Sequence, residues 1–243
     1  MELNAKCERC GVDVKTYYPS YPYCFECIYK PYTDSEREAI VSNMKKAYNS
    51  IVKTPKIMEE EPINGIWSQW QANTYHQSSP KLAQFMASHF DKSEHVIDIG
   101  CGNAFYIAAL KNKGFNCTGV EGFRLNNFLH PNVLIHDLTK PLRLVEKGSV
   151  ICLEVIEHID KRYENVVLDS ITNHCTGDLI FSWALTGQAG IGHVNCVDRS
   201  YAIRQIESRG FRYLQDSTEE ARTKWVNSNT PWFRDTLLIF SRL

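Results

Sequence analysis

The stretch VIDIGCGNA, residues 96–104, decides the fold of this chain. It opens with an apolar run that is typical of a buried parallel strand, and it continues through Gly100 and Gly102 into an expected helix. Because glycine has no side chain, the backbone can turn tightly there and approach a ligand closely. The stretch therefore predicts the first strand, turn and helix of a ligand-binding α/β domain.

Strand and helix patterns alternate after this point. Helices are expected at 81–90, with Pro80 in the first turn, and at 103–112, 161–174 and 198–209. Apolar strands are expected at 95–100, 116–121, 132–136, 149–154, 178–184, 211–214 and 236–240. This alternation predicts an α/β fold with a doubly wound, mostly parallel seven-stranded sheet. Its ligands should bind at the carboxyl ends of the strands.

Carboxylates stand at the ends of three successive predicted strands: Asp98, Glu121 and Asp137. Glu121 follows the glycines by about twenty residues, a spacing at which an acid accepts hydrogen bonds from both ribose hydroxyls. Asp137 could accept a hydrogen bond from an adenine amino group. The third small residue of the turn is Ala104 rather than glycine, which disfavours a NAD enzyme. The pattern predicts a nucleoside-containing cofactor.

Four segments together resemble the class I S-adenosylmethionine-dependent methyltransferases: VIDIGCGNAFYIAAL, GVEG, HDLTKPL and ICLEVIEHI. The resemblance covers roughly residues 67–243 and implies a Rossmann-like methyltransferase domain whose last two strands form an antiparallel hairpin. It also implies contacts to S-adenosylmethionine: Asp98, Gly100, Cys101, Gly102 and Asn103 at the methionine end, Glu121 and Gly122 at the ribose, Asp137 and Leu138 at the adenine, and Glu154 nearby.

An aromatic segment, Trp67–His76, directly precedes this domain. Class I enzymes often use such a segment as a lid, and methyl transfer needs a site shielded from water. Trp70 and Tyr75 are therefore expected to cover the cofactor. The alternative is that the aromatic side chains only pack the connector against the domain.

Glu154, Glu157 and His158 form an E-x-x-E-H segment after the fourth strand. The segment resembles two groups of O-methyltransferases that bind a divalent metal there, the quinone-biosynthesis and the small-RNA 2′-hydroxyl enzymes. It also resembles metal-free members in which only the first glutamate lies near the cofactor. His193, in a glycine-rich loop at 187–195, could complete such a metal site or accept a hydroxyl proton.

The expected reaction is O-methylation of a small molecule or a sugar hydroxyl, with His193 or, second, Glu154 as the base. After the fourth strand the chain lacks the two prolines and the aromatic residue that enzymes for N-methylation of nucleobases usually carry. It also lacks a Pro-Cys pair that would supply the nucleophile for C5-methylation of pyrimidines. Two alternatives stay open: an RNA methyltransferase that binds its substrate through an N-terminal module, and a scaffold without catalytic activity.

That module has two Cys-x-x-Cys pairs, Cys7 with Cys10 and Cys24 with Cys27. The spacing predicts a structural zinc ribbon over residues 1–32, and redox pairs are the rival interpretation. A helix and the aromatic connector or lid follow at 33–79, and the methyltransferase domain is expected at 80–243. The ribbon is aromatic and nearly neutral, so it could dock on a protein partner or stack on unpaired bases.

The overall composition restricts the partners. The chain of 243 residues has 27 basic and 28 acidic side chains, so no broad positive field favours nucleic acid. No apolar run reaches the length of about 20 residues that spans a membrane. Nine cysteines without a secretory signal pattern predict a reducing, cytoplasmic location.

Overall fold

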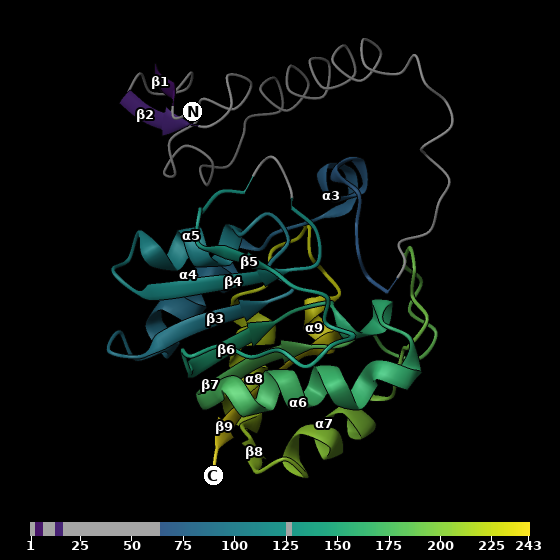
Figure 1. The fold of residues 1–243 in the computed structure, drawn as a ribbon. Coiled ribbons are helices and arrows are strands. Elements are labelled where there is room, and N and C mark those ends of the chain that lie inside the picture. Colours follow the sequence, from purple (N-terminus) through teal and green to yellow (C-terminus); the bar gives the residue numbers. More distant parts are fainter. Residues whose placement is uncertain (1–2, 7–12, 17–63, 125–127) are drawn as a thin grey trace. The chain divides into compact units, whose positions relative to one another are not determined.

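The computed structural model describes residues 3–6, 13–16, 64–124 and 128–243, and it divides the chain into two compact units, Met1–Glu60 and Glu61–Leu243 (Figure 1). In the first unit, strands β1 (Leu3–Lys6) and β2 (Asp13–Thr16) pair antiparallel. The four cysteines of the expected zinc ribbon and the expected helix that follows them lie outside the described residues. The zinc ribbon therefore stays a prediction.

A seven-stranded sheet forms the centre of the second unit. Its strands lie in the order β5 (Val133–Ile135), β4 (Asn116–Glu121), β3 (His95–Ile99), β6 (Gly148–Cys152), β7 (Cys175–Ser182), β9 (Leu237–Arg242) and β8 (Phe211–Tyr213). The first five are parallel, and β9 runs antiparallel to both β7 and β8. The prediction of a doubly wound, mostly parallel sheet is confirmed.

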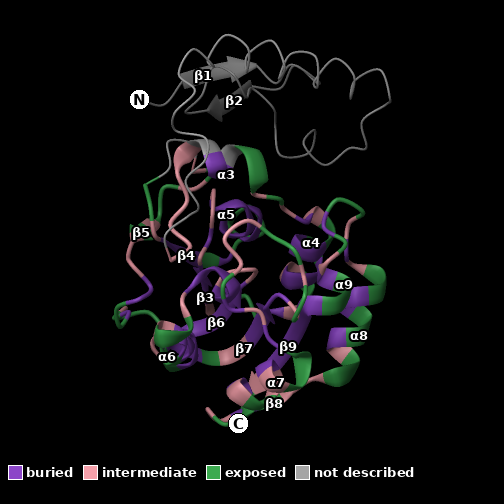
Figure 2. Ribbon diagram, turned by 90° about the vertical axis from the view of Figure 1, so that its right-hand side faces the viewer, coloured by how far each residue is buried: buried purple, intermediate pink, exposed green. Residues whose placement is uncertain are grey.

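Helices cover both faces of this sheet. On one side, α5 (Phe105–Lys111) contacts β3 and β4, α4 (Pro80–His89) packs on α5, and α8 (Gln215–Lys224) contacts β9. On the other side, α6 (Glu164–His174) contacts β6 and β7, and α7 (Arg199–Glu207) packs on α6. Figure 2 shows α6 on one side of the sheet and α4, α8 and α9 on the other. The remaining short helices are α3 (Gln69–Tyr75), α9 (Phe233–Thr236) and the 3-10 turns η1 (Ile156–His158) and η2 (Lys161–Tyr163).

Three details differ from the sequence prediction. The helix expected at 161–174 opens as a 3-10 turn, in which the Asp160 carboxylate accepts a hydrogen bond from the Arg162 amide. The strand expected at 178–184 begins earlier, at Cys175, and ends at Ser182. The final two strands pair antiparallel as expected, but α8 and α9 lie between them in the chain.

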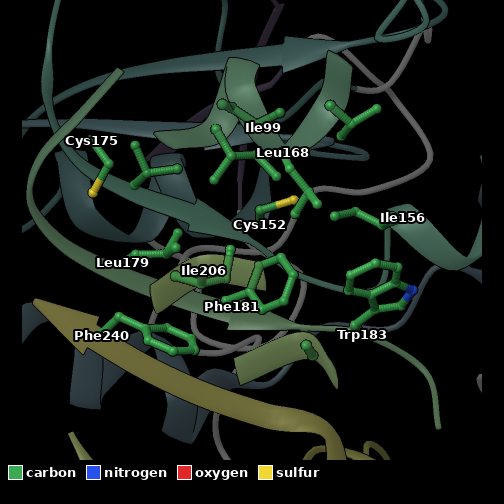
Figure 3. Close-up of a cluster of buried hydrophobic side chains, with 14 of the residues drawn as sticks. Ile99, Cys152, Ile156, Leu168, Cys175, Leu179, Phe181, Trp183, Ile206 and Phe240 are labelled. Atoms are coloured by element: carbon green, nitrogen blue, oxygen red, sulfur yellow. The ribbon is translucent and has the colours of Figure 1, made fainter. Parts of the chain in front are cut away.

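A hydrophobic core cluster lies between the sheet and helices α6 and α7. Ile99, Cys152 and Phe181 from the sheet meet Leu168 of α6 and Ile206 of α7 there, all essentially unexposed (Figure 3). Full burial of one such large side chain stabilises the fold by about 1.5–3 kcal/mol. This packing holds the strand ends, and with them the site, in fixed positions. No helix in the described part of the chain is long and apolar enough to cross a membrane.

Candidate functional site

The turn between β3 and α5 has a backbone that requires small residues. Gly100 has a φ of +79° and Gly102 of +55°, in the left-handed region where L side chains are strained. A Cβ atom on Gly100 would lie 2.3 Å from Cγ2 of Val155, so a side chain would also clash there. Ala104, the third small residue, adopts a φ of +68° before α5 begins. Glycine is thus required at positions 100 and 102 by the backbone conformation and by the close approach of Val155 to Gly100 and of His76 to Gly102.

Two buried carboxylates adjoin this turn. Glu121 accepts hydrogen bonds from the backbone N–H groups of Gly102 (2.7 Å) and Gly122 (2.8 Å), and burial nevertheless raises its pKa to about 7. Asp98 is 2% exposed, and its Oδ2 has no hydrogen-bond partner among the described residues. Burial, and then the charge of Glu121, raise the pKa of Asp98 to about 8. The pair would be stabilised in its ionised form by a cationic ligand group.

Two cavities lie at this edge of the sheet, one of about 390 Å³ and one of about 60 Å³. Of the cofactor residues expected from sequence, those that line the larger cavity are Tyr75, Asp98, Gly100, Cys101, Gly102, Asn103 and Glu154. Those that line the smaller are Gly100, Glu121, Gly122, Leu138 and Glu154. Asp137 lines neither, and its carboxylate instead accepts a hydrogen bond from the Thr139 amide at 2.9 Å. The side chain of Trp70 lies outside the described residues.

Glu154 follows β6 by two residues and adopts a left-handed φ of +53°. Its amide donates to Ser182 Oγ (2.8 Å), and its carboxylate accepts from Thr236 Oγ1 (2.9 Å) and Gln188 Nε2 (3.3 Å). Burial raises the pKa of Glu154 above its usual range. These contacts hold the carboxylate at the walls of both cavities, where it can accept a proton.

Glu157, His158 and His193 come together beside Glu154. Each offers one ligand atom, and the three atoms lie within 4.8 Å of one another. Glu157 is fully buried, and within the described ranges no N–H or O–H group donates to either of its carboxylate oxygens. Burial and the neighbouring charge of Glu154 raise the pKa of Glu157 well above its usual range, and burial lowers the pKa of His158 to about 4. The unpaired oxygens of Glu157, the unpaired Nδ1 of His158 and the nearby imidazole of His193 fit a divalent cation.

The loop that carries His193 is anchored by Asn195, which is 5% exposed. The Asn195 amide nitrogen and that of Val194 both donate to the Glu157 carbonyl, at 3.0 and 2.8 Å. The Asn195 side chain donates to the buried carboxylate of Glu164 at 3.0 Å. Trp183, fully buried in the core, donates its ring N–H to the Asn195 carbonyl at 2.6 Å. These bonds keep His193 beside Glu157.

The aromatic side chain of Trp67 lies at the same place, directly before the N-cap of helix α3. A capping box begins it, because Ser68 Oγ accepts from the Gln71 amide and Gln71 Oε1 accepts from the Ser68 amide. The Trp67 ring lies 5.3 Å from the rings of both His76 and His158, measured between centroids.

Sequence reasoning assigned no individual role to several residues that line the larger cavity: His76, Gln188, Trp232 and Phe233. His76 is the last residue of the expected lid segment and Gln188 lies in the glycine-rich loop at 187–195, so both could have been suspected for that reason. Trp232 and Phe233 lie near the end of the chain, far from every motif, and carried no such signal.

Comparison with known proteins relates this chain to methyltransferases. No family model matches the chain. A stretch of 133 residues is 26% identical to the ubiquinone biosynthesis O-methyltransferase of Rickettsia akari, and it covers 51% of this chain and 49% of that protein. The chain thus spans about half the length of the curated relative that it matches.

Solved structures share the fold. The magnesium protoporphyrin IX methyltransferase of Synechocystis PCC 6803, with bound S-adenosylmethionine, has a TM-score of 0.50 at 16% identity, over 72% of this chain and 90% of that one. A chain from a complex that contains the Haloferax volcanii Trm112 methyltransferase activator has a TM-score of 0.52 at 11% identity, over 75% and 98%. Together with the strand order, these matches show that the second unit of this chain has the fold of the class I S-adenosylmethionine-dependent methyltransferases.

Proposed function

We propose that this protein transfers the methyl group of S-adenosylmethionine to a hydroxyl group of a small molecule. One observation carries the proposal: the glycine turn with Asp98 and the carboxyl–imidazole cluster with His158 and His193 line the same cavity of about 390 Å³. This arrangement would bring a cofactor bound at the turn next to a group that can activate an acceptor. The O-methyltransferase relative supports the same reaction class.

The cofactor is expected to lie along the carboxyl edge of β3 and β4. Asp98 would accept a hydrogen bond from its ammonium group, which relieves the unpaired buried oxygen. Glu121 would accept hydrogen bonds from the ribose hydroxyls, and Leu138 would contact the adenine. Asp137 could accept a hydrogen bond from the adenine amino group only if that bond replaced the one it now accepts from the Thr139 amide.

The cavity favours an acceptor without phosphate groups. Its wall includes the rings of Tyr75, Tyr106, Trp232 and Phe233. Among the described residues that line either cavity there is no lysine or arginine to hold a phosphate. This composition favours an aromatic or sugar-like hydroxyl compound over a nucleic acid backbone.

Glu154 is the proposed proton acceptor. His193 faces Glu157 and His158, whereas Glu154 lines both cavities, and its raised pKa suits proton transfer. In the transfer, the acceptor oxygen would bond to the methyl carbon as the carbon–sulfur bond breaks and its electron pair stays on sulfur. The hydroxyl proton would pass to Glu154, and the product S-adenosylhomocysteine would be released.

Glu157, His158 and His193 are proposed to bind a divalent cation. The unpaired oxygens of Glu157 and the unpaired Nδ1 of His158 fit such an ion. When bound, it would lower the pKa of the acceptor hydroxyl. The four-cysteine module is proposed to hold a separate structural zinc ion, and measuring one zinc per chain that is lost in Cys24→Ser would support this.

Calorimetric titration with S-adenosylhomocysteine tests the proposed function. The full chain should bind it, and Glu121→Gln should bind more weakly because one carboxylate oxygen that accepts a ribose hydrogen bond is replaced by a donor. Glu207→Gln is the matched control and should leave the affinity unchanged, since Glu207 is exposed and lines neither cavity. Failure of well-folded wild-type protein to bind would contradict the proposal.

A further inference from the structure

His76 occupies the boundary between the two cavities and lines both. It caps the carboxyl end of α3, where its backbone N–H donates to the Ala72 carbonyl at 3.2 Å. The Trp67 ring lies 5.3 Å from its imidazole ring. Yet the ring nitrogen Nδ1 is buried and, among the residues that the structure describes, has no hydrogen-bond partner. A fixed, buried polar atom without a partner is costly and is a candidate for ligand binding.

The imidazole lies directly against the glycine turn. A Cβ atom built on Gly102 would come within 2.9 Å of Nδ1 of His76. The same turn is bounded by Asp98, the proposed partner of the cofactor's ammonium group. His76 therefore faces the place where the amino-acid end of the cofactor should lie.

The charges of the cavity walls leave one part of the cofactor without a partner. Asp98, Glu121 and Glu154 supply negative charge for its ammonium and sulfonium groups. For its carboxylate, the described residues of both walls offer no lysine or arginine. Imidazoles are the basic groups present, and two of them, those of His158 and His193, belong to the cluster with Glu157.

We propose that the Nδ1–H group of His76 donates a hydrogen bond to the carboxylate at the methionine end of the cofactor. The inference rests on the proposed function, because it requires S-adenosylmethionine or its product in this cavity. Burial lowers the pKa of His76 to about 4, so the free protein at neutral pH has an uncharged ring with one N–H donor. The bond to a carboxylate gives the orphaned ring nitrogen a charged partner. Gly102 is then needed not only for its φ but also to leave room for this ring.

Two ligands that differ in one group test the assignment. S-adenosylhomocysteine carries the carboxylate, and S-adenosyl-3-thiopropylamine is the same molecule without it. Titrated into the full chain, His76→Ala should weaken S-adenosylhomocysteine about 10- to 100-fold, as expected for loss of one hydrogen bond to a charged group. The affinity for the amine should not change. His76→Gln, which retains an N–H donor, should lie between wild type and His76→Ala.

Gln77→Ala is the control, since Gln77 lines the same cavity with a neutral donor. It should leave the ratio of the two affinities unchanged. If His76→Ala weakens the binding of both ligands equally, His76 has a purely structural role. If it leaves the binding of S-adenosylhomocysteine unchanged, His76 has no role in binding. Either result overturns the inference. If wild-type protein binds neither ligand, the proposed function fails and this inference with it. If it binds both equally well, only the carboxylate contact is refuted.

Discussion

Replacing Glu157 by glutamine should stabilise the metal-free protein, whereas the same change at Glu164 should destabilise it. Both glutamates are buried in the second unit, at 0% and 4% exposure. No described donor reaches the carboxylate of Glu157, but that of Glu164 accepts hydrogen bonds from Lys161, Tyr201 and Asn195. The two substitutions therefore apply the same chemistry to opposite environments.

The magnitude for Glu157→Gln follows from its protonation. Burial and the charge of Glu154 raise the pKa of Glu157 well above 4.5, so the folded state keeps a proton that the unfolded chain has lost. Folded-state stability then falls as pH rises, by about 1.4 kcal/mol per unit above 4.5, until the pH reaches the folded pKa. Glutamine removes this penalty. Its advantage should therefore be smallest near pH 4.5 and grow as the pH rises toward the folded pKa of Glu157.

Urea unfolding of the full chain in metal-free buffer, followed by tryptophan fluorescence from about pH 5 to about pH 8, measures this difference. Glu164→Gln should lose about 1.5–3 kcal/mol, the value of hydrogen bonds to a charged group, over the whole range. Added Mn²⁺ should stabilise wild type but not Glu157→Gln. The reasoning is refuted if Glu157→Gln is less stable than wild type at neutral pH, or if its advantage does not grow with pH.

Three further outcomes are expected. Gly102→Ala should weaken S-adenosylhomocysteine binding by about tenfold or more, as measured by calorimetry. The added Cβ atom would lie 2.9 Å from Nδ1 of His76, and an alanine with this positive φ would cost about 1–2 kcal/mol in backbone strain. Asn195→Ala should release the loop of His193 and lower Mn²⁺ affinity about 10- to 100-fold, as read from paramagnetic resonance titration. Ligand binding at neutral pH should release a proton from Asp98, whose pKa of about 8 falls beside an ammonium group, so affinity should increase from pH 6 to 8. Calorimetry in two buffers of different ionisation enthalpy would detect that proton, and Asp98→Asn should abolish its release.

The parts of the fold that were predictable from sequence are those set by local patterns. The glycine turn and the buried parallel strands were found because apolar runs and glycines lie next to each other in the chain. Helix α8 was missed for a physical reason. Of its ten residues only Thr218, Ala221 and Arg222 are buried, so its sequence, QDSTEEARTK, has no apolar stripe.

The site was predictable only in part, because its geometry is tertiary. Residues Glu157 and His193 were candidates for one metal site, but what brings them together is a bond between backbone groups far apart in the chain, from Val194 to the Glu157 carbonyl. The hydrogen bond from the Asn195 side chain to Glu164, which anchors the loop of His193, follows from no sequence pattern. The role proposed for His76 likewise depends on its approach to a turn that begins more than twenty residues later in the chain.

The electrostatic state of this edge of the sheet links these separate features. Asp98, Glu121 and Glu157 are buried acids whose pKa values are raised, and the partly buried His76 and the buried His158 are imidazoles whose pKa values are lowered. Without ligands, all five groups are thus driven toward their neutral forms, at a cost in stability that a ligand of matching charge would remove. The acids would be stabilised in their charged forms by a cation at the glycine turn and by another at the carboxyl–imidazole cluster. The imidazoles can donate a hydrogen bond to an anion or bind a metal ion. A cofactor with an ammonium, a sulfonium and a carboxylate group, next to a divalent cation, meets these demands together, whereas an uncharged nucleoside would meet few of them. The strongest argument for the proposed function is therefore that one pair of ligands accounts for every unpaired polar group of the glycine turn and of the carboxyl–imidazole cluster.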